Sequence, residues 1–233
     1  IRAALNRSVN RQGMIDAFLA GQGEPAHHPI PGVLPEQVEP SATFTFDPAE
    51  AGRILERAGW VPGPDGVRVR GGQAARFTLM YPATDTVRRD LAQAFASDVR
   101  AAGIDVRLEG LGWEAIEPRM GADALVLGGG DPFDPGFKAW QLLHSSNAAD
   151  GFNNPGGFND PEMVVADEAA SRGATPADRA PQFTKLFDRV AEVQAPHITL
   201  CNLTTPYVQN PKVGGVEIYA DASRQFRGAA INP

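Results

Sequence analysis

The feature that most constrains this sequence is an alternation of strand-like and helix-like segments between residues 77 and 127. Apolar residues alternate with polar ones over 77–81 and 104–108, which predicts half-buried strands. Helical spacing over 87–99, with Gly103 after it, predicts a helix between them. A short helix around 113–121 and an apolar run over 124–127, typical of a central buried strand, complete the series. This order predicts an α/β fold with a mixed, mostly parallel sheet, flanked by helices and joined by right-handed crossovers.

Further helices are predicted from their first residues. Residues 1–20 indicate one or two short helices. Asp47-Pro48-Ala49-Glu50 has an N-cap residue, a proline suited to the first turn and a glutamate that can close a capping box. Asn159-Asp160-Pro161-Glu162 and Thr175-Pro176-Ala177-Asp178 begin two more helices in the same way. Pro181 either kinks the second of these or marks its true start.

The remaining segments have weaker patterns. Residues 21–46 hold several prolines and little periodicity, so we expect an ordered loop there. Residues 198–203 are typical of a strand, and residues 206–219 indicate further extended structure. The chain opens on a helix-like segment, without an initiator methionine or a signal peptide, so we expect it to be a piece of a longer protein.

Charge and composition exclude several classes of function. The net charge is −7 and no basic stripe occurs, so nucleic acid is not an expected partner. No apolar run approaches the roughly 20 residues that span a membrane. The single cysteine, Cys201, allows neither an internal disulfide nor a CxxC metal site.

A glycine- and aspartate-rich segment directly after the apolar run is the strongest candidate binding site. Ligands of open α/β sheets bind beyond the carboxyl ends of the strands, and consecutive glycines let backbone approach a ligand closely. The aspartates could receive an amine or cation, and the phenylalanine could stack on a ligand. The alternative is a tight turn in which Asp131 or Asp134 caps a helix. Candidate ligand-binding residues are Gly128, Gly129, Gly130, Asp131, Phe133 and Asp134.

The histidines give one further candidate. His144 follows this segment by about a helix length and could face the same pocket, so we include it among the ligand-binding residues. His27 and His28 lie in a proline-rich loop, and His197 follows a proline, so packing roles are expected for these three. An enzyme would need a serine or carboxylate hydrogen-bonded to His144, and GxSxG is absent. We therefore predict no catalytic residues, no metal site and no cofactor.

Several motifs, in order along the chain, resemble those of the extracellular solute-binding proteins of family 5, which carry dipeptides, oligopeptides, nickel chelates and related solutes. Individually each motif is weak, but their shared order makes the resemblance specific. They are Ile1–Asn6 with Arg11-Gln12, Gly21–Ala26, Phe46–Ala51 with Leu55–Trp60, Asp160–Glu162, Asp178-Arg179 and Ala195–Ile198.

The resemblance implies a type II periplasmic-binding-protein-like lobe. Residues 1–203 would form the C-terminal lobe of a two-lobe protein, and residues 204–233 would return toward the other lobe. The loop 128–136 would face the cleft between the lobes. Peptide-binding relatives have an aspartate for the ligand's amino terminus where this chain has Gly128, with Asp131 three residues later. The Asp-Pro-Phe-Asp-Pro sequence is more similar to the corresponding loop of nickel-binding relatives.

The function implied is capture of a peptide or similar small solute for an ABC importer. A nickel or nickel-chelate binding protein and a non-transport sensor or chaperone-like module are the alternatives. The partners implied are the small-molecule or peptide ligand and the permease subunits. A monomer, located in the periplasm or outside the cell, is expected, with membrane association only through the transporter or an N-terminal anchor outside this sequence.

Overall fold

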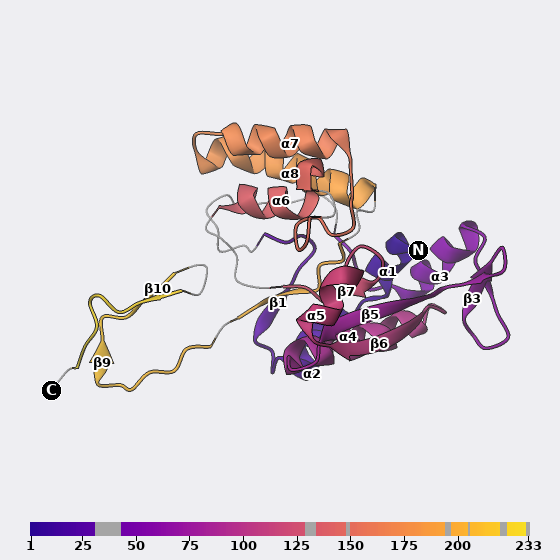
Figure 1. Cartoon of the computed structure of the whole chain (residues 1–233), viewed down its shortest axis with the longest axis horizontal. Helices are drawn as coiled ribbons and strands as arrows, with labels where there is room; N and C mark the ends of the chain where they lie inside the picture. Colours follow the sequence, from indigo (N-terminus) through magenta and orange to yellow (C-terminus); the bar gives the residue numbers. More distant parts are fainter. Residues whose placement is uncertain are drawn as a thin grey trace.

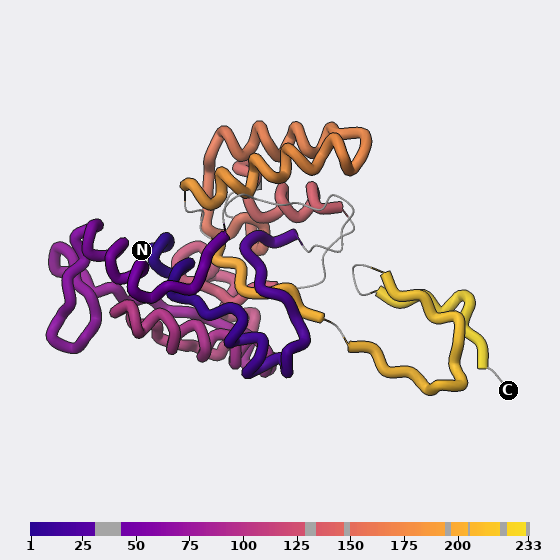
Figure 2. Tube along the Cα trace, turned by 180° about the vertical axis from the view of Figure 1, so that it is seen from behind, coloured from indigo at the N-terminus to yellow at the C-terminus, as the bar shows by residue number. Residues whose placement is uncertain are grey.

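The computed structural model describes residues 1–30, 43–128, 134–147, 150–193, 197–204, 206–219 and 223–231 (Figure 1). Three parts are distinct in Figures 1 and 2. A parallel sheet with its helices forms one part, a layer of three helices lies beside it, and the C-terminal segment projects away from both.

The sheet is built around its middle strand. β5 (Arg76–Pro82) pairs in parallel with β6 (Asp105–Leu111) along its whole length, and with the two-residue strand β7 (Ala124–Leu125) on its other side. α4 (Thr86–Arg100) connects β5 to β6, while α5 (Trp113–Ile116) and the 3₁₀ turn η1 (Glu117–Arg119) connect β6 to β7. The predicted strand–helix order and parallel pairing are therefore confirmed.

Both faces of the sheet are covered. Leu79 points into the main core, where it packs with residues of α4, α1 (Arg2–Ser8) and α3 (Pro48–Arg57). Its neighbour Met80 is completely buried on the other face, against Ile116 and Met120. Because alternate residues of a strand point to opposite faces, burial of both requires a layer on each side. β5 is thus the central strand, buried on both faces at Leu79 and Met80, rather than the half-buried strand predicted from its alternation.

A three-helix layer forms a second core. It consists of α6 (Pro135–Leu143), α7 (Pro161–Arg172) and α8 (Pro176–Glu192). Its best-buried members include Met163, Phe183, Leu186 and Phe187, with at most 2% of each side chain exposed. Full burial of each such side chain contributes about 1.5–3 kcal/mol. The turn η2 (Ser145–Asn147) follows α6.

A buried arginine ties a two-stranded antiparallel ribbon to the first two helices. β1 (Gly23–Pro25) pairs with β8 (Cys201–Leu203). Arg11, at the start of α2 (Arg11–Phe18), is 4% exposed and donates to the carbonyl oxygens of Ala26 and Thr199 at 2.9 and 2.8 Å. It also donates to the Asn6 carbonyl and amide oxygens, both at 3.1 Å. One side chain therefore connects α1 and α2 to the residues that adjoin both strands of the ribbon.

The smaller strands lie at the periphery. β2 (Val61–Pro62), β3 (Arg68–Arg70) and β4 (Gln73–Ala74) form an antiparallel sheet. In the projecting C-terminal segment, β9 (Val213–Gly214) pairs with β12 (Ala230–Ile231), and β10 (Glu217–Ile218) pairs with β11 (Arg224–Gln225). Residues such as Val208 and Ile231 are 91% and 79% exposed there.

The helix starts follow the predicted capping. Asp47, Asp160 and Thr175 each accept a hydrogen bond from the first turn of α3, α7 and α8. The capping box expected at Glu50 is incomplete, because that carboxylate binds Arg53 and Arg57 instead. Pro181 lies inside α8, which begins at Pro176.

Two predicted strands were wrong in extent or position. Residues 124–127 are not the central strand, because β7 is two residues long and lies at one side of the order β6-β5-β7. Its side chains are half-buried, which fits a strand with a single neighbour in this sheet. The strand expected over 198–203 is shortened to β8, and it pairs with β1 from within the predicted loop 21–46.

Candidate functional site

Gly128 lies just beyond the carboxyl end of β7, where the sequence predicts ligand binding. It is exposed, and a Cβ placed on it would meet no atom within 4 Å. Its carbonyl oxygen accepts a hydrogen bond from the guanidinium of Arg88, which also pairs with Asp85 at 2.5 Å. The sequence analysis missed Arg88. It could have been found, because α4 begins where β5 ends and neighbouring parallel strands end at the same edge.

Four predicted ligand residues, Gly129, Gly130, Asp131 and Phe133, lie outside the described residues. The two predicted ligand residues that flank them, Gly128 and Asp134, are described. These two belong to the sheet edge and to the start of α6 respectively, so the segment runs from the sheet to the three-helix layer.

Asp134 is fixed by partners inside the chain. Its carboxylate accepts the Gly136 amide at 2.7 Å and so caps α6, as the structural alternative for this residue predicted. The same oxygen binds the guanidinium of Arg179 from α8. Partial burial opposes the charged form, but the Arg179 guanidinium and the Gly136 amide outweigh it and lower the pKa of Asp134. The side chain remains 58% exposed, so one face of the carboxylate is still accessible.

Gly136 allows this arrangement because the helices approach closely there. A Cβ on Gly136 would lie 3.0 Å from an Arg179 nitrogen and 3.3 Å from the Ser171 hydroxyl. The start of α6 therefore packs directly on α7 and α8. A larger side chain at this position would push Arg179 away from Asp134.

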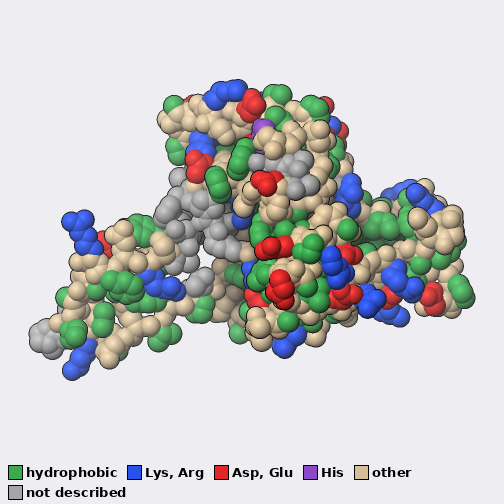
Figure 3. Space-filling view, viewed as in Figure 1, with side chains coloured by type: hydrophobic (Ala, Val, Ile, Leu, Met, Phe, Trp, Pro, Cys, Tyr) green, Lys and Arg blue, Asp and Glu red, His purple; other side chains and the backbone are tan. Residues whose placement is uncertain are grey.

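An exposed aromatic pair continues the surface from Asp134. Phe137 and Trp140 on α6 are 52% and 37% exposed, with ring centroids 5.8 Å apart. Figure 3 shows hydrophobic side chains on the viewed face of the helical layer. Aromatic rings with accessible faces are suited to contact apolar parts of a ligand or partner.

His144 ends α6 and is half-buried. Its Nδ1 accepts the Ser146 amide at 3.2 Å and lies 2.8 Å from the Ser146 hydroxyl. This is the serine–histidine contact that an enzyme would require. In the described part of the chain, however, no carboxylate binds the ring to orient it as a general base. Because Nδ1 bonds a residue only two positions along the chain, we interpret the contact as part of a local turn and not as a catalytic pair.

A buried asparagine links the loop after η2 to the end of α6. Asn154 is fully buried and has a φ of 38°. Its side chain bonds both backbone groups of Phe158, at 2.7 and 3.0 Å, and also donates to the His144 carbonyl at 3.4 Å. Asparagine tolerates this left-handed conformation better than most residues. The sequence analysis did not single out Asn154.

Asp167 is a second residue that the sequence analysis missed. It lies on α7 and is 2% exposed, and no residue of the described ranges donates a hydrogen bond to its Oδ1. Burial, and then the charges of Glu168 and Asp134, raise the pKa of Asp167 to about 7. Nothing in its local pattern signals this, because an aspartate in a helix is usually exposed.

The other histidines lie in packed positions. The His27 ring accepts the Phe44 amide at 3.2 Å, and His28 packs on Phe187 with ring centroids 5.1 Å apart. Burial lowers the pKa of His28 and of His197 to about 4, so both are neutral at pH 7. Within the described ranges, no three histidine, cysteine, aspartate or glutamate side chains are grouped to hold a metal ion. No described helix is long and apolar enough to cross a membrane.

Comparison with known proteins gives three informative matches. The chain is 46% identical over 186 residues to Protein XP55 of Streptomyces lividans, covering 80% of this chain and 34% of that protein. It is 25% identical over 241 residues to the nickel-binding periplasmic protein of Escherichia coli, covering 100% of this chain and 45% of that protein. The structure of the oligopeptide-binding protein AppA from Bacillus subtilis, in complex with a nonapeptide, matches with a TM-score of 0.77 at 23% identity, over 87% of this chain and 41% of AppA.

These matches establish the fold and bound the chain's extent. The similarity to AppA confirms the periplasmic-binding-protein-like α/β fold. The chain spans less than half the length of the relatives it matches. The family model described as bacterial extracellular solute-binding proteins, family 5 Middle, matches residues 1–150, which include the whole parallel sheet, α6 and His144. The chain therefore belongs to family 5 of the bacterial extracellular solute-binding proteins, a family of binding proteins rather than enzymes.

Proposed function

We propose that this chain is one lobe of an extracytoplasmic solute-binding protein that captures a peptide or similar small solute for an ABC importer. The family match over residues 1–150 carries this proposal. Residues 1–203 would form the lobe and residues 204–233 would contact the rest of the full-length protein. The exposed apolar residues of that segment, such as Val208 and Ile231, support such a contact.

Capture would occur by closure of two lobes on the solute. A ligand that contacts both lobes binds the closed state more tightly than the open one, and so shifts the population toward closure. On this lobe, the segment from Gly128 to Asp134 would form the wall of the cleft. Its support is the position of Gly128 at the carboxyl end of β7 and the anchoring of Asp134 by Arg179.

Each predicted ligand residue has a distinct role in this proposal. Asp131 would receive an amine or cation, Phe133 would pack on an apolar group, and the three glycines would let the backbone approach the solute. Asp134 would act through its exposed oxygen while still capping α6. His144 would contribute if the solute is a nickel chelate.

Nickel or a nickel chelate is the second candidate solute. The 25% identity to the nickel-binding periplasmic protein of Escherichia coli extends over 100% of this chain and favours it. The fold itself does not discriminate between nickel and peptide solutes, because the structure of AppA, which shares this fold, holds a nonapeptide. A metal bound only by the described residues would lack a preformed cluster of three ligands, so a chelate is the more suitable form of the metal.

The test is thermal unfolding of the full-length protein with trialanine, free Ni²⁺ and Ni²⁺ with histidine. A solute that binds only the folded state raises the melting temperature, by an amount that grows with its concentration over Kd. We expect a rise with one of these solutes. The Asp131→Asn variant should lose that rise, and Glu168→Gln, which removes a charge from an exposed position on α7, should keep it.

The results separate the candidates. A rise with trialanine supports the peptide reading, and a rise only with nickel and histidine supports the chelate reading. An equal rise in wild type and Asp131→Asn would show that the segment 128–134 does not receive the ligand's charged group. No rise with any of these solutes would contradict both solute classes.

A further inference from the structure

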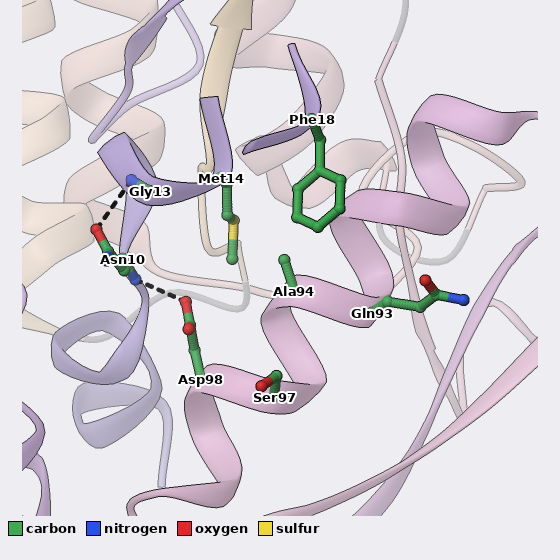
Figure 4. Close-up of a pocket in the computed structure, with 8 residues that line it drawn as sticks. All are labelled: Asn10, Gly13, Met14, Phe18, Gln93, Ala94, Ser97 and Asp98. Atoms are coloured by element: carbon green, nitrogen blue, oxygen red, sulfur yellow. Dashed lines mark hydrogen bonds between the residues drawn. The ribbon is translucent and has the colours of Figure 1, made fainter. Parts of the chain in front are cut away.

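A groove between α2 and α4 lies far from the proposed solute site. Its volume is about 330 Å³. Figures 1 and 2 both place α2 at the opposite end of the molecule from α6, α7 and α8. Figure 4 shows the lining side chains, which are Asn10, Gly13, Met14, Phe18, Gln93, Ala94, Ser97 and Asp98.

Among the residues that the structure describes, Asp98 is the only charged one that lines the groove. One carboxylate oxygen accepts the Asn10 amide at 2.8 Å. Within the described ranges Asp98 forms no ion pair, and no cation offsets the burial that raises the pKa of its carboxyl group. A partly buried carboxylate without a countercharge is stabilised by a cation that enters beside it.

The wall opposite Asp98 is apolar. Figure 4 shows the Phe18 ring, the Met14 side chain and Ala94 around the same space. Phe18 is 44% exposed, whereas Met14 is 2% exposed, so the ring forms the accessible edge of the groove and the methionine forms its floor. An aromatic ring also attracts a cation placed over its face.

We propose that this groove binds an aliphatic ammonium or guanidinium group, with the cation at Asp98 and the hydrocarbon stem against Phe18 and Met14. The site is separate from the solute cleft and does not depend on the proposed transport function. A volume of about 330 Å³ is at the lower end for ligand pockets, which suits one small group. A metal ion does not fit, because one carboxylate cannot supply the six or more oxygens that a hard cation takes.

The same chemistry occurs in free amines and in lysine or arginine side chains of a partner protein. Both sources are tested by amide NMR titration of the full chain. The probes are butylammonium, butylguanidinium, 1-butanol and arginine blocked at both ends as N-acetyl-arginine methylamide. We expect the two cations to shift amides of α2 and α4, and 1-butanol to bind at least tenfold more weakly.

Three variants make the test specific. Asp98→Asn keeps an oxygen for the Asn10 amide, so the fold is retained, and it should weaken cation binding at least tenfold. Phe18→Ala should weaken binding about fivefold, because part of the apolar wall is lost. The control, Asp90→Asn, removes a charge from α4 outside the groove, where Asp90 pairs with Arg89, and should bind as wild type does.

Each result bears on the proposal. Tighter binding of blocked arginine than of butylguanidinium assigns the group to a protein partner, and equal or weaker binding assigns it to a free amine. The proposal is overturned if the cations shift no amides of α2 and α4. It is also overturned if Asp98→Asn binds like Asp90→Asn, or if 1-butanol binds as well as butylammonium.

Discussion

Replacing Arg11 with methionine should destabilise the protein more than replacing any exposed arginine. The guanidinium is buried, and its partners among the described residues are neutral oxygens on Asn6, Ala26, Phe44 and Thr199. Burial lowers the pKa of Arg11 to about 10, which still leaves it charged at pH 7. Methionine fills much of the same volume but donates no hydrogen bond.

The expected loss of stability is estimated from the acceptors that would have no donor in the variant. Three of the five contacts, to the Ala26 carbonyl and to the two Asn6 oxygens, are buried. A buried acceptor without a donor costs about 1–3 kcal/mol. Because the variant no longer buries a charge, we take the lower value for each, and expect Arg11→Met to lose about 3 kcal/mol. Arg11→Lys should lose about 2 kcal/mol, since one ammonium cannot reach all the acceptors on four residues that the guanidinium reaches.

Urea unfolding followed by tryptophan fluorescence measures this loss. The control is Arg53→Met on α3, whose side chain is 54% exposed, so that loss of its ion pair with Glu50 should cost far less stability than loss of Arg11. A loss below about 1 kcal/mol for Arg11→Met would refute the reasoning, because the ribbon and the first helices would then be held together without this side chain.

Three further changes test other parts of the structure. Asp160→Ala should cost about 1–2 kcal/mol by urea unfolding, because it removes the cap of α7, whereas Asp160→Asn keeps the cap, loses only the pair with Arg189 and should cost less. The pKa of Asp167 is about 7 in the folded state, above its unfolded value, so its contribution to stability is present below the unfolded pKa and is lost as pH rises toward 7. Asp167→Asn should therefore stabilise the protein relative to wild type more at pH 8 than at pH 5, and an equal effect at both would contradict the assignment. Asn154→Ala should cost about 2 kcal/mol and speed amide exchange at Phe158, because it removes the hydrogen bonds to that residue.

Local signals predicted the helices well. A cap at Asp47, Asp160 or Thr175 acts within one turn, so a few residues contain the information. The alternation around Leu79 likewise identified β5. Its burial on both faces was not predictable from alternation alone, because Met80 is covered by α5, which comes about 35 residues later.

Contacts between distant segments account for the remaining errors. An apolar run at 124–127 is compatible with either a central or an edge strand. Its position depends on which strands it pairs with, and β7 pairs with β5 alone in this sheet. The residues Asp131 and Asp134 were both candidates for a helix cap, and the hydrogen bond from Gly136 identifies Asp134. Its partner Arg179 lies 45 residues away, so only the packing of α8 on α6 brings the two together.

Hydrogen exchange of the full-length protein, with and without a saturating solute from the thermal panel, tests the central claim most directly. If the segment from Gly128 to Asp134 forms the wall of the cleft, exchange should slow there and in the first turn of α6 when trialanine or nickel–histidine binds. Exchange in α3, which packs in the main core and not in the three-helix layer, should change little. Slowing confined to other segments, with residues 128–137 unchanged, would contradict the claim that this sheet edge holds the solute.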